Sequence, residues 1–343
     1  MDLSYYGVHR VIEPKGVLPQ PAWRLDNTMS IYDNELLIDV ETLNIDSASF
    51  TQIRRQAGDD VDLIGQIMMD IVKNRGKHHN PKTGSGGMLI GTVKKIGKNY
   101  PNRDIKVGDR IATLVSLSLT PLKIREIKKI CINKDQVDID GEAILFASGI
   151  FAKLPDDMSN KLALSVLDVA GAPAQTERLV KQGDTVLVIG ASGKSGMLCL
   201  HQAKKNVGKD GRVIALCHSD RGLKEVQELG LADILIKADA TDALMVHNKL
   251  VQATNGELAD LTINCVNVPG TEMSTIMSTK QNGTVYFFSM ATSFTSAALG
   301  AEGIGKDINM IIGNGYCENH SEIALKVLRE NTKLRELYEK RYA

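Results

Sequence analysis

The chain of 343 residues carries 41 basic and 41 acidic side chains, so its formal net charge is zero at neutral pH. This balance gives no reason to expect a nucleic acid or a membrane surface as a partner. No apolar run approaches the roughly 20 residues needed to span a bilayer, and the N-terminus lacks the apolar core of a signal peptide. The length predicts about two domains, and the cytoplasm is the expected location.

Five cysteines are far apart, and most lie in apolar runs such as "VIALC" and "TINCV". Their spacing offers neither a disulfide framework nor a paired C-x-x-C metal site. We interpret them as reduced, buried thiols: Cys131, Cys199, Cys217, Cys265 and Cys317.

Residues 1–155 show short strands broken by turns, such as "ELLIDVETLNI" and "GMLIGTVKKIG". Helix is expected only near "FTQIRRQAG" and "DLIGQIMMDIVKNRG". This pattern predicts a first domain that is largely antiparallel and barrel-like.

Residues 156–318 alternate strand and helix patterns, with strands expected at "TVLVIG", "RVIALC", "ADILI", "DLTINCV", "GTVYFFS" and "DINMIIG". Strands separated by helices require crossover connections and a parallel sheet covered on both faces. The fold class is therefore α/β, with a doubly wound, Rossmann-type second domain. Residues 319–343 are expected to form a helix that returns to pack near the first domain.

The stretch "TVLVIGASGKSGMLCL" places Gly193-Lys194-Ser195 where a triphosphate loop could lie. That loop needs a glycine five positions before Gly193, and Val188 stands there, so the spacing excludes it. The pattern Gly190-x-x-Gly193-x-x-Gly196 after a buried strand instead indicates a turn that binds a dinucleotide pyrophosphate. A strand–turn–helix corner without a ligand is the alternative. The expected cofactor contacts here are Gly190, Ser192, Gly193, Lys194, Ser195 and Gly196.

The order of "ELLIDVETLNIDSASF", "GMLIGTVKKIG", "IKVGDRIATL", "LPDDMS", "GDTVLVIGASGKSG" and "GTVYFFSMATSF" resembles the medium-chain dehydrogenase/reductases across nearly the whole chain. This resemblance implies a GroES-like first domain, which holds the substrate, and a Rossmann domain. Longer stretches such as "YGVHRVIEPKGVLPQPA" and "INCVNVPGTEMSTI" resemble a branch that acts on a 3,5-diamino acid in lysine fermentation. Membership of that branch implies reversible oxidative deamination at carbon 3, with hydride transfer to a nicotinamide cofactor.

Zinc-dependent members of this family hold a catalytic metal with a cysteine, a histidine and a further cysteine or acid. The matching segments here read "NIDSAS" and "GSGGMLIG", which leave Asp46 without ligand partners at the family spacing. We therefore expect a zinc-free enzyme.

Oxidation of an amine requires a proton acceptor beside the reacting nitrogen, and a diamino acid also needs fixed negative charge. Asp46 and Asp168 are the catalytic candidates, because the resemblance places both in segments that line the substrate cleft. The alternative is that each carboxylate caps a turn or a helix.

The substrate carboxylate needs donors, and "TGSGG" offers a glycine-rich backbone beside the hydroxyl of Ser85. A tight connection into the next strand is the alternative. Histidines are more often structural, so His9 and His79 stay outside the catalytic prediction. The residues expected to bind substrate are Ser47, Asn80, Ser85 and Gly86.

An NAD-specific site ends its second strand with an acid, but Cys217 stands at that position. The missing acid, with Arg221 nearby, favours NADP slightly over NAD, while Asp220 could restore the acid. The expected contacts at this end are His218, Ser219 and Arg221. The nicotinamide end is expected near Asn267, Ser289 and Met290.

Two other functions share this fold: a zinc-free quinone or enone reductase, and a non-catalytic dinucleotide sensor. Asp46 and Asp168 distinguish these functions, because an amine dehydrogenase needs acids in its pocket whereas the pocket of a quinone or enone reductase can be apolar. The family resemblance also implies a homodimer, formed along the last strand of the parallel sheet near "DINMIIG".

Overall fold

The computed structural model describes residues 3–82, 84, 86–313 and 315–343, and these fall into two compact units. The first unit ends at Met158 and the second begins at Ser159, close to the predicted boundary at residue 155. Each unit has its own sheet and core, and each is described by itself below.

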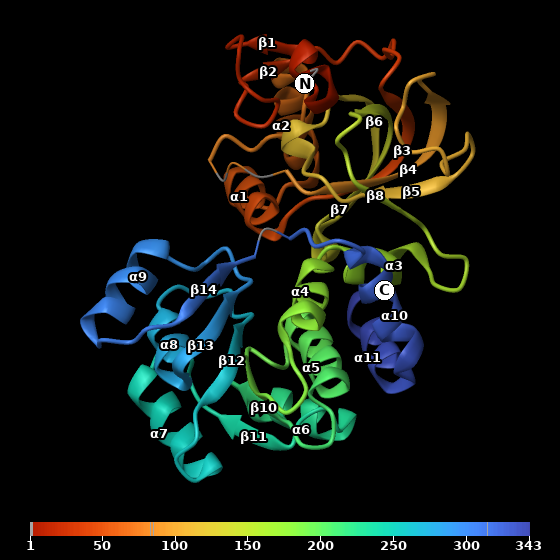
Figure 1. Ribbon diagram of the computed structural model, residues 1–343. Coiled ribbons are helices and arrows are strands. Elements are labelled where there is room, and N and C mark those ends of the chain that lie inside the picture. The colour runs from red at the N-terminus through yellow and green to blue at the C-terminus, as the bar shows by residue number, and fades with distance from the viewer. Residues whose placement is uncertain (1–2, 83, 85, 314) are drawn as a thin grey trace. The chain divides into compact units, whose positions relative to one another are not determined.

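The first unit is built on a six-stranded antiparallel sheet with the order β6-β7-β3-β4-β5-β8. Among the described residues, the two outer strands of this order do not pair with each other. A separate two-stranded sheet, β1-β2, lies near the N-terminus (Figure 1). The bounds are β1 (Val11–Glu13), β2 (Arg24–Leu25), β3 (Leu36–Asn44), α1 (Ser47–Ala57), α2 (Val61–Arg75), β4 (Met88–Ile96), β5 (Arg110–Thr113), β6 (Leu122–Cys131), β7 (Gln136–Leu145) and β8 (Phe151–Lys153).

Both predicted helices of this unit form, and local sequence explains where they begin and end. Asp46 and Asp60 precede α1 and α2, and each carboxylate accepts a hydrogen bond from a backbone N–H in the first turn. Gly58 and Gly76 end the helices in the left-handed conformation, which glycine adopts without steric cost.

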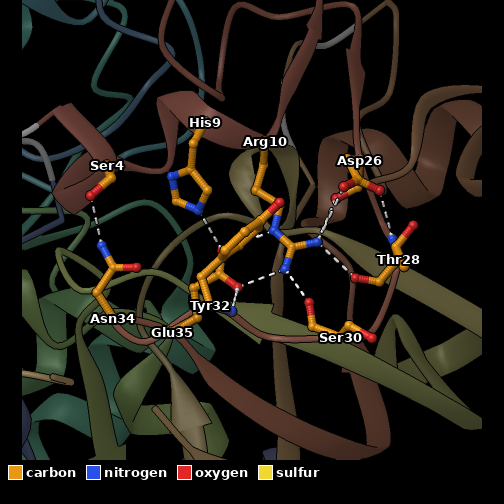
Figure 2. Close-up of polar contacts among 9 residues, drawn as sticks. All are labelled: Ser4, His9, Arg10, Asp26, Thr28, Ser30, Tyr32, Asn34 and Glu35. Carbon is orange, nitrogen blue, oxygen red and sulfur yellow. Dashed lines mark hydrogen bonds and ion pairs between the residues drawn. The ribbon is translucent and has the colours of Figure 1, made fainter. Parts of the chain in front are cut away.

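A buried ion pair organises the N-terminal part of the first unit (Figure 2). The guanidinium of Arg10 binds both carboxylate oxygens of Glu35, with Nε–Oε1 and Nη2–Oε2 distances of 2.8 and 2.6 Å. His9 Nε2 lies 2.7 Å from Oε1 of the same carboxylate. The guanidinium also donates to the carbonyls of Thr28 and Ser30. His9 and Arg10 are therefore engaged with Glu35, in a structural role.

The second unit contains a parallel six-stranded sheet with the order β11-β10-β9-β12-β13-β14. Helices α4 and α5 lie on one side of it, and α7, α8 and α9 on the other (Figure 1). This arrangement confirms the predicted doubly wound domain. The bounds are α3 (Asn160–Leu167), α4 (Gly171–Leu179), β9 (Thr185–Ile189), α5 (Lys194–Val207), β10 (Arg212–Cys217), α6 (Asp220–Leu229), β11 (Ile234–Lys237), α7 (Ala243–Thr254), β12 (Ala259–Asn264), α8 (Glu272–Ser278), β13 (Thr279–Phe287), α9 (Phe294–Gly303) and β14 (Asn309–Ile312).

The C-terminal segment forms two helices, α10 (His320–Glu330) and α11 (Thr332–Tyr342), where the sequence predicted one. Asn331 interrupts them with φ −131° and ψ 97°, and its side chain caps α11 by accepting from the Leu334 N–H at 3.0 Å. Helix α10 packs against α3, α4 and α5, and α11 packs against α3, so this segment clusters with the second unit. Its predicted return to the first domain stays a prediction.

Within the described part of the chain, none of the helices combines the length and the apolar character that crossing a membrane requires.

Replacing Glu35 by Gln tests the buried ion pair. The variant leaves the buried Arg10 charge with only its longer contact to the partly exposed Asp26, at 3.5 Å, so the free energy of unfolding at pH 7 should fall by about 3 kcal/mol. Asp33→Asn is the matched control, because Asp33 pairs with Lys98 at an exposed position and should contribute no more than about 1 kcal/mol. Urea unfolding of both variants gives the measurement.

The difference in unfolding free energy between wild type and Glu35→Gln should depend on pH. Burial opposes ionisation of Glu35, but hydrogen bonds from His9, Arg10 and Tyr32 outweigh it and lower the pKa from 4.5 to about 2. The stabilisation is therefore complete above pH 4.5 and is lost as the pH falls toward 2. A difference between wild type and Glu35→Gln that stays constant over this range would contradict the assignment.

Candidate functional site

The glycine turn joins β9 to α5 at the carboxyl end of the parallel sheet. The N–H groups of Gly190 and Ala191 both donate to the Leu216 carbonyl of β10 at 3.1 Å. The Gly193 N–H donates to the Gly190 carbonyl at 3.0 Å, which closes the turn. Helix α5 begins with Gly193 as its N-cap, and no side chain caps it. An uncapped helix N-terminus presents N–H groups and positive dipole to an anion.

The three glycines of the turn have different roles. Gly190 has φ +80°, which favours glycine. A Cβ on Gly196 would lie 2.2 Å from the Gly190 carbonyl oxygen, so only glycine permits this approach of helix to strand. Gly193 is exposed with φ −78°, and a Cβ there would meet only the Gly190 oxygen at 3.2 Å. Gly193 therefore leaves space for a ligand, whereas Gly190 and Gly196 shape the corner.

The residues predicted at the nicotinamide end follow β12, which neighbours β9, and β13, which is the next strand in the sheet order. The Ser289 hydroxyl donates to Asn267 Oδ1 at 3.4 Å, so the structure brings these two side chains together. Met290 beside them is 75% exposed, which argues against a core role. The order of strands reverses between β9 and β12, and open parallel sheets bind ligands outside such a switch point.

The predicted ribose end follows β10. Burial raises the pKa of the Cys217 thiol, while hydrogen bonds from Ser192 act in the opposite direction. The Ser219 hydroxyl caps α6 by accepting from the Gly222 N–H at 3.1 Å. Asp220 pairs with Lys237 at 2.6 Å, and exposed Arg221 pairs with Glu225 at 3.1 Å. His218 is also exposed.

Two residues with separate predicted roles form an ion pair in the second unit. Lys194 Nζ, expected to bind the cofactor, lies 2.6 Å from Oδ2 of Asp168, expected to be catalytic. Asp168 follows the last turn of α3, where its backbone N–H donates to the Leu164 carbonyl. Ser195, in the first turn of α5, is buried.

The two carboxylate oxygens of Asp46 lie in different environments. Oδ1 accepts the Ser49 N–H at 2.9 Å and caps α1, as the structural alternative predicted. Oδ2 is buried and has no hydrogen-bond partner among the residues that the structure describes. One carboxylate oxygen therefore remains available to accept a proton.

The glycine-rich segment lies next to the backbone of Asp46. A Cβ on Gly86 would approach the His78 carbonyl to 2.4 Å, and a Cβ on Gly87 would approach the Asp46 nitrogen to 2.9 Å. The predicted Ser85 and the side chain of Ser47 lie outside the described residues. The turn therefore runs between the backbones of His78 and Asp46.

His78 is a residue that the sequence reasoning missed. It is fully buried, and neither ring nitrogen has a hydrogen-bond partner in the described part of the chain. Burial lowers its pKa to about 4, against opposing effects of the Gly86 backbone and the Asp46 carboxylate. In the segment "KHHN", the sequence offers no signal that distinguishes His78 from a histidine in the core.

Asn80 is buried, and its side chain holds α1 in place. Its amide nitrogen donates to Gln52 Oε1 at 2.7 Å and to the Ser49 carbonyl at 3.3 Å, while its oxygen accepts the Lys82 N–H. These contacts support a role in positioning α1, and direct substrate binding by Asn80 stays a prediction.

No three His, Cys, Asp or Glu side chains converge as a metal site within residues 3–82, 84, 86–313 and 315–343. The expected absence of zinc from the enzyme stays a prediction.

The parallel sheet with its glycine corner is a Rossmann-type fold, and comparison with solved structures shows which proteins share the fold. A mycobacterial protein solved with NADPH superposes with a TM-score of 0.57 and 19% identity, covering 89% of this chain and 83% of that chain. This similarity confirms the fold of a medium-chain dehydrogenase/reductase.

Sequence comparison identifies the family. The model of the L-erythro-3,5-diaminohexanoate dehydrogenase N-terminal domain matches residues 9–155. The dehydrogenases of that name from Acetoanaerobium sticklandii and Fusobacterium nucleatum are 58% and 55% identical, each over 98% of both chains. The chain belongs to the L-erythro-3,5-diaminohexanoate dehydrogenase family, which confirms the expected branch and its oxidoreductase class.

Valine substitutions separate the roles of the glycines. Gly193→Val should fold, because its Cβ meets no close atom except the Gly190 oxygen, but its branched side chain should block a pyrophosphate. Dinucleotide affinity measured by titration calorimetry should fall by at least tenfold, or about 1.4 kcal/mol. Gly196→Val should instead lower the melting temperature, because the clash there is with backbone. A folded Gly193→Val protein with wild-type affinity would remove this turn from the cofactor site.

Proposed function

We propose that the chain catalyses the reversible oxidative deamination of L-erythro-3,5-diaminohexanoate at carbon 3, a reaction of lysine fermentation. The products are 5-amino-3-oxohexanoate, ammonia and a reduced nicotinamide cofactor, and one water molecule is consumed. The identity of 58% over 98% of a dehydrogenase with this substrate in its name carries the proposal.

The residues of the glycine turn fit a dinucleotide. Gly193 leaves open space, and α5 begins without a capping side chain, so backbone N–H groups can bind the pyrophosphate. We assign pyrophosphate binding to residues 190–196, the ribose end to His218, Ser219 and Arg221, and the nicotinamide end to Asn267, Ser289 and Met290. The nicotinamide ring would accept the hydride from carbon 3.

The reaction needs a base, because the amine must be neutral before hydride leaves carbon 3. We assign this role to Asp46, whose Oδ2 is buried and has no partner among the described residues. Asp168 would bind an ammonium group, in exchange for its ion pair with Lys194. Ser47, Asn80, Ser85 and Gly86 would bind or position the rest of the substrate.

We propose that NADP is used at least as well as NAD. Asp220, the acid nearest to the ribose end, already pairs with Lys237, and Arg221 is mostly exposed. An arginine here could bind a 2′-phosphate by charge-assisted hydrogen bonds.

We also propose a homodimer, formed along β14. This strand is the last in the sheet order and pairs only with β13 among the described residues. The partner of the site is a small diamino acid, with no role for nucleic acid or membrane.

Absorbance of the reduced cofactor tests the reaction and the cofactor preference together. Purified protein with L-erythro-3,5-diaminohexanoate should reduce both NAD and NADP, with kcat/KM for NADP equal to or above that for NAD. Reduction of a quinone in place of diamino acid oxidation would favour the reductase alternative. A tenfold preference for NAD would show that Asp220 or the backbone sets specificity.

Replacing Asp46 by Asn tests the base. Asparagine keeps an oxygen that can cap α1 but removes the charge and basicity, so kcat should fall by about 10² to 10⁴. Asp60→Asn is the matched control, because Asp60 caps α2 through the same contact, from the Leu63 N–H at 3.0 Å, and is exposed. The control should keep wild-type turnover.

Steady-state kinetics separates two roles for Asp46. An increase of KM alone would indicate binding of an ammonium group in the ground state. Wild-type kinetics in Asp46→Asn would exclude Asp46 from the site.

A further inference from the structure

Helix α11 contacts the glycine turn through two long side chains. The hydroxyl of Tyr338, which is fully buried, donates to the Lys194 carbonyl. Arg341 Nη1 donates to the Ser192 carbonyl at 3.2 Å. These two carbonyls lie on either side of Gly193, so the C-terminal helix holds the peptide groups that form the turn.

Holding a carbonyl also fixes the direction of the next N–H, because the two point to opposite sides of a trans peptide group. Arg341 fixes the peptide group that carries the Gly193 N–H, whose bond to Gly190 closes the turn. Tyr338 fixes the peptide group that carries the Ser195 N–H, in the first turn of α5. N–H groups in a first turn have no acceptor within their own helix and are available to an anion. The contact from Arg341 therefore holds the closed turn, and the contact from Tyr338 orients an N–H that could bind a pyrophosphate.

Arg341 also links the glycine turn to the ribose end. Its Nη2 pairs with Glu225 Oε2, and Glu225 Oε1 pairs with Arg221 at 3.1 Å. Arg341 and Glu225 are both mostly buried, at 17% and 16% exposed. Partial burial reduces screening by solvent, so the Coulombic attraction within this pair is screened less than in a pair on the surface.

A third contact holds the side chain of the turn itself. Lys194 Nζ, paired with Asp168, lies 5.8 Å from the centre of the Tyr342 ring, which also belongs to α11. The described contacts of the turn thus come from α3 and α11 as well as from its own strand and helix.

We propose that Tyr338 and Arg341 are positioning residues of the dinucleotide site. They bind the carbonyls of Lys194 and Ser192, and through them they set the geometry of the closed turn and of the Ser195 N–H that would bind the pyrophosphate, without touching the cofactor. This inference rests on the proposed function, since it assumes that the turn binds a dinucleotide.

Two conservative variants test the proposal by binding rather than by turnover. Tyr338→Phe keeps the ring but loses the hydroxyl, and Arg341→Gln loses the paired donors. Calorimetry with NADH and with ADP-ribose should show dissociation constants raised by roughly three- to thirtyfold. Lys340→Gln is the matched control, because Lys340 is an exposed cation on the same helix turn, and it should bind as the wild type does.

Hydrogen exchange separates positioning from a loss of stability. In both variants, the peptide that covers residues 190–196 should exchange faster, while the strands of the parallel sheet keep their protection. Faster exchange across the whole second unit, with a matching fall in melting temperature, would show a general structural role and overturn the proposal. Unchanged affinity in both variants, with normal binding by wild type, would also overturn it. Absence of dinucleotide binding by the wild type would refute the proposed function itself, and this inference with it.

Discussion

The close approach of α5 to β9 is the constraint on which the second unit depends. A side chain on Gly196 would meet the Gly190 carbonyl at 2.2 Å, so the helix can start directly above the end of the strand only with glycine there. This geometry places the uncapped N-terminus of α5 at the switch point of the sheet, between β9 and β12. Steric exclusion at one residue thus determines where the uncapped N-terminus of α5 lies.

The two units present chemistry in different ways. In the second unit, the turn between β9 and α5 presents backbone N–H groups, and contacts from β10 and α11 hold this turn in place. In the first unit, one carboxylate serves structure and, in our proposal, chemistry, because Asp46 Oδ1 caps α1 while Oδ2 is left without a described partner. Capping fixes the orientation of the carboxyl group, and a fixed orientation is what a general base requires.

The sequence predicted the features that depend on local pattern. Buried β-branched runs predicted β9, β10 and β12, and the glycine spacing predicted the corner. It could not predict contacts between residues far apart in the chain: Tyr338 lies 144 positions from Lys194, and Arg341 lies 149 positions from Ser192. The break at Asn331 was missed because the helical pattern continues through it. Burial of His78 depends on tertiary packing, which periodicity does not report.

The ion pair between Lys194 and Asp168 explains how this turn differs from a triphosphate loop. There, the lysine charge contacts phosphate, whereas here the ammonium group is already 2.6 Å from a carboxylate. Attraction of an anion would then come mainly from N–H groups and the helix dipole, whose direction the contacts from α11 help to fix. The same ion pair also indicates which of the two candidate acids, Asp46 or Asp168, is better suited to act as the base. Asp168 would have to exchange Lys194 for a substrate ammonium, but Asp46 Oδ2 has no described partner to lose, so Asp46 is the stronger candidate for the base.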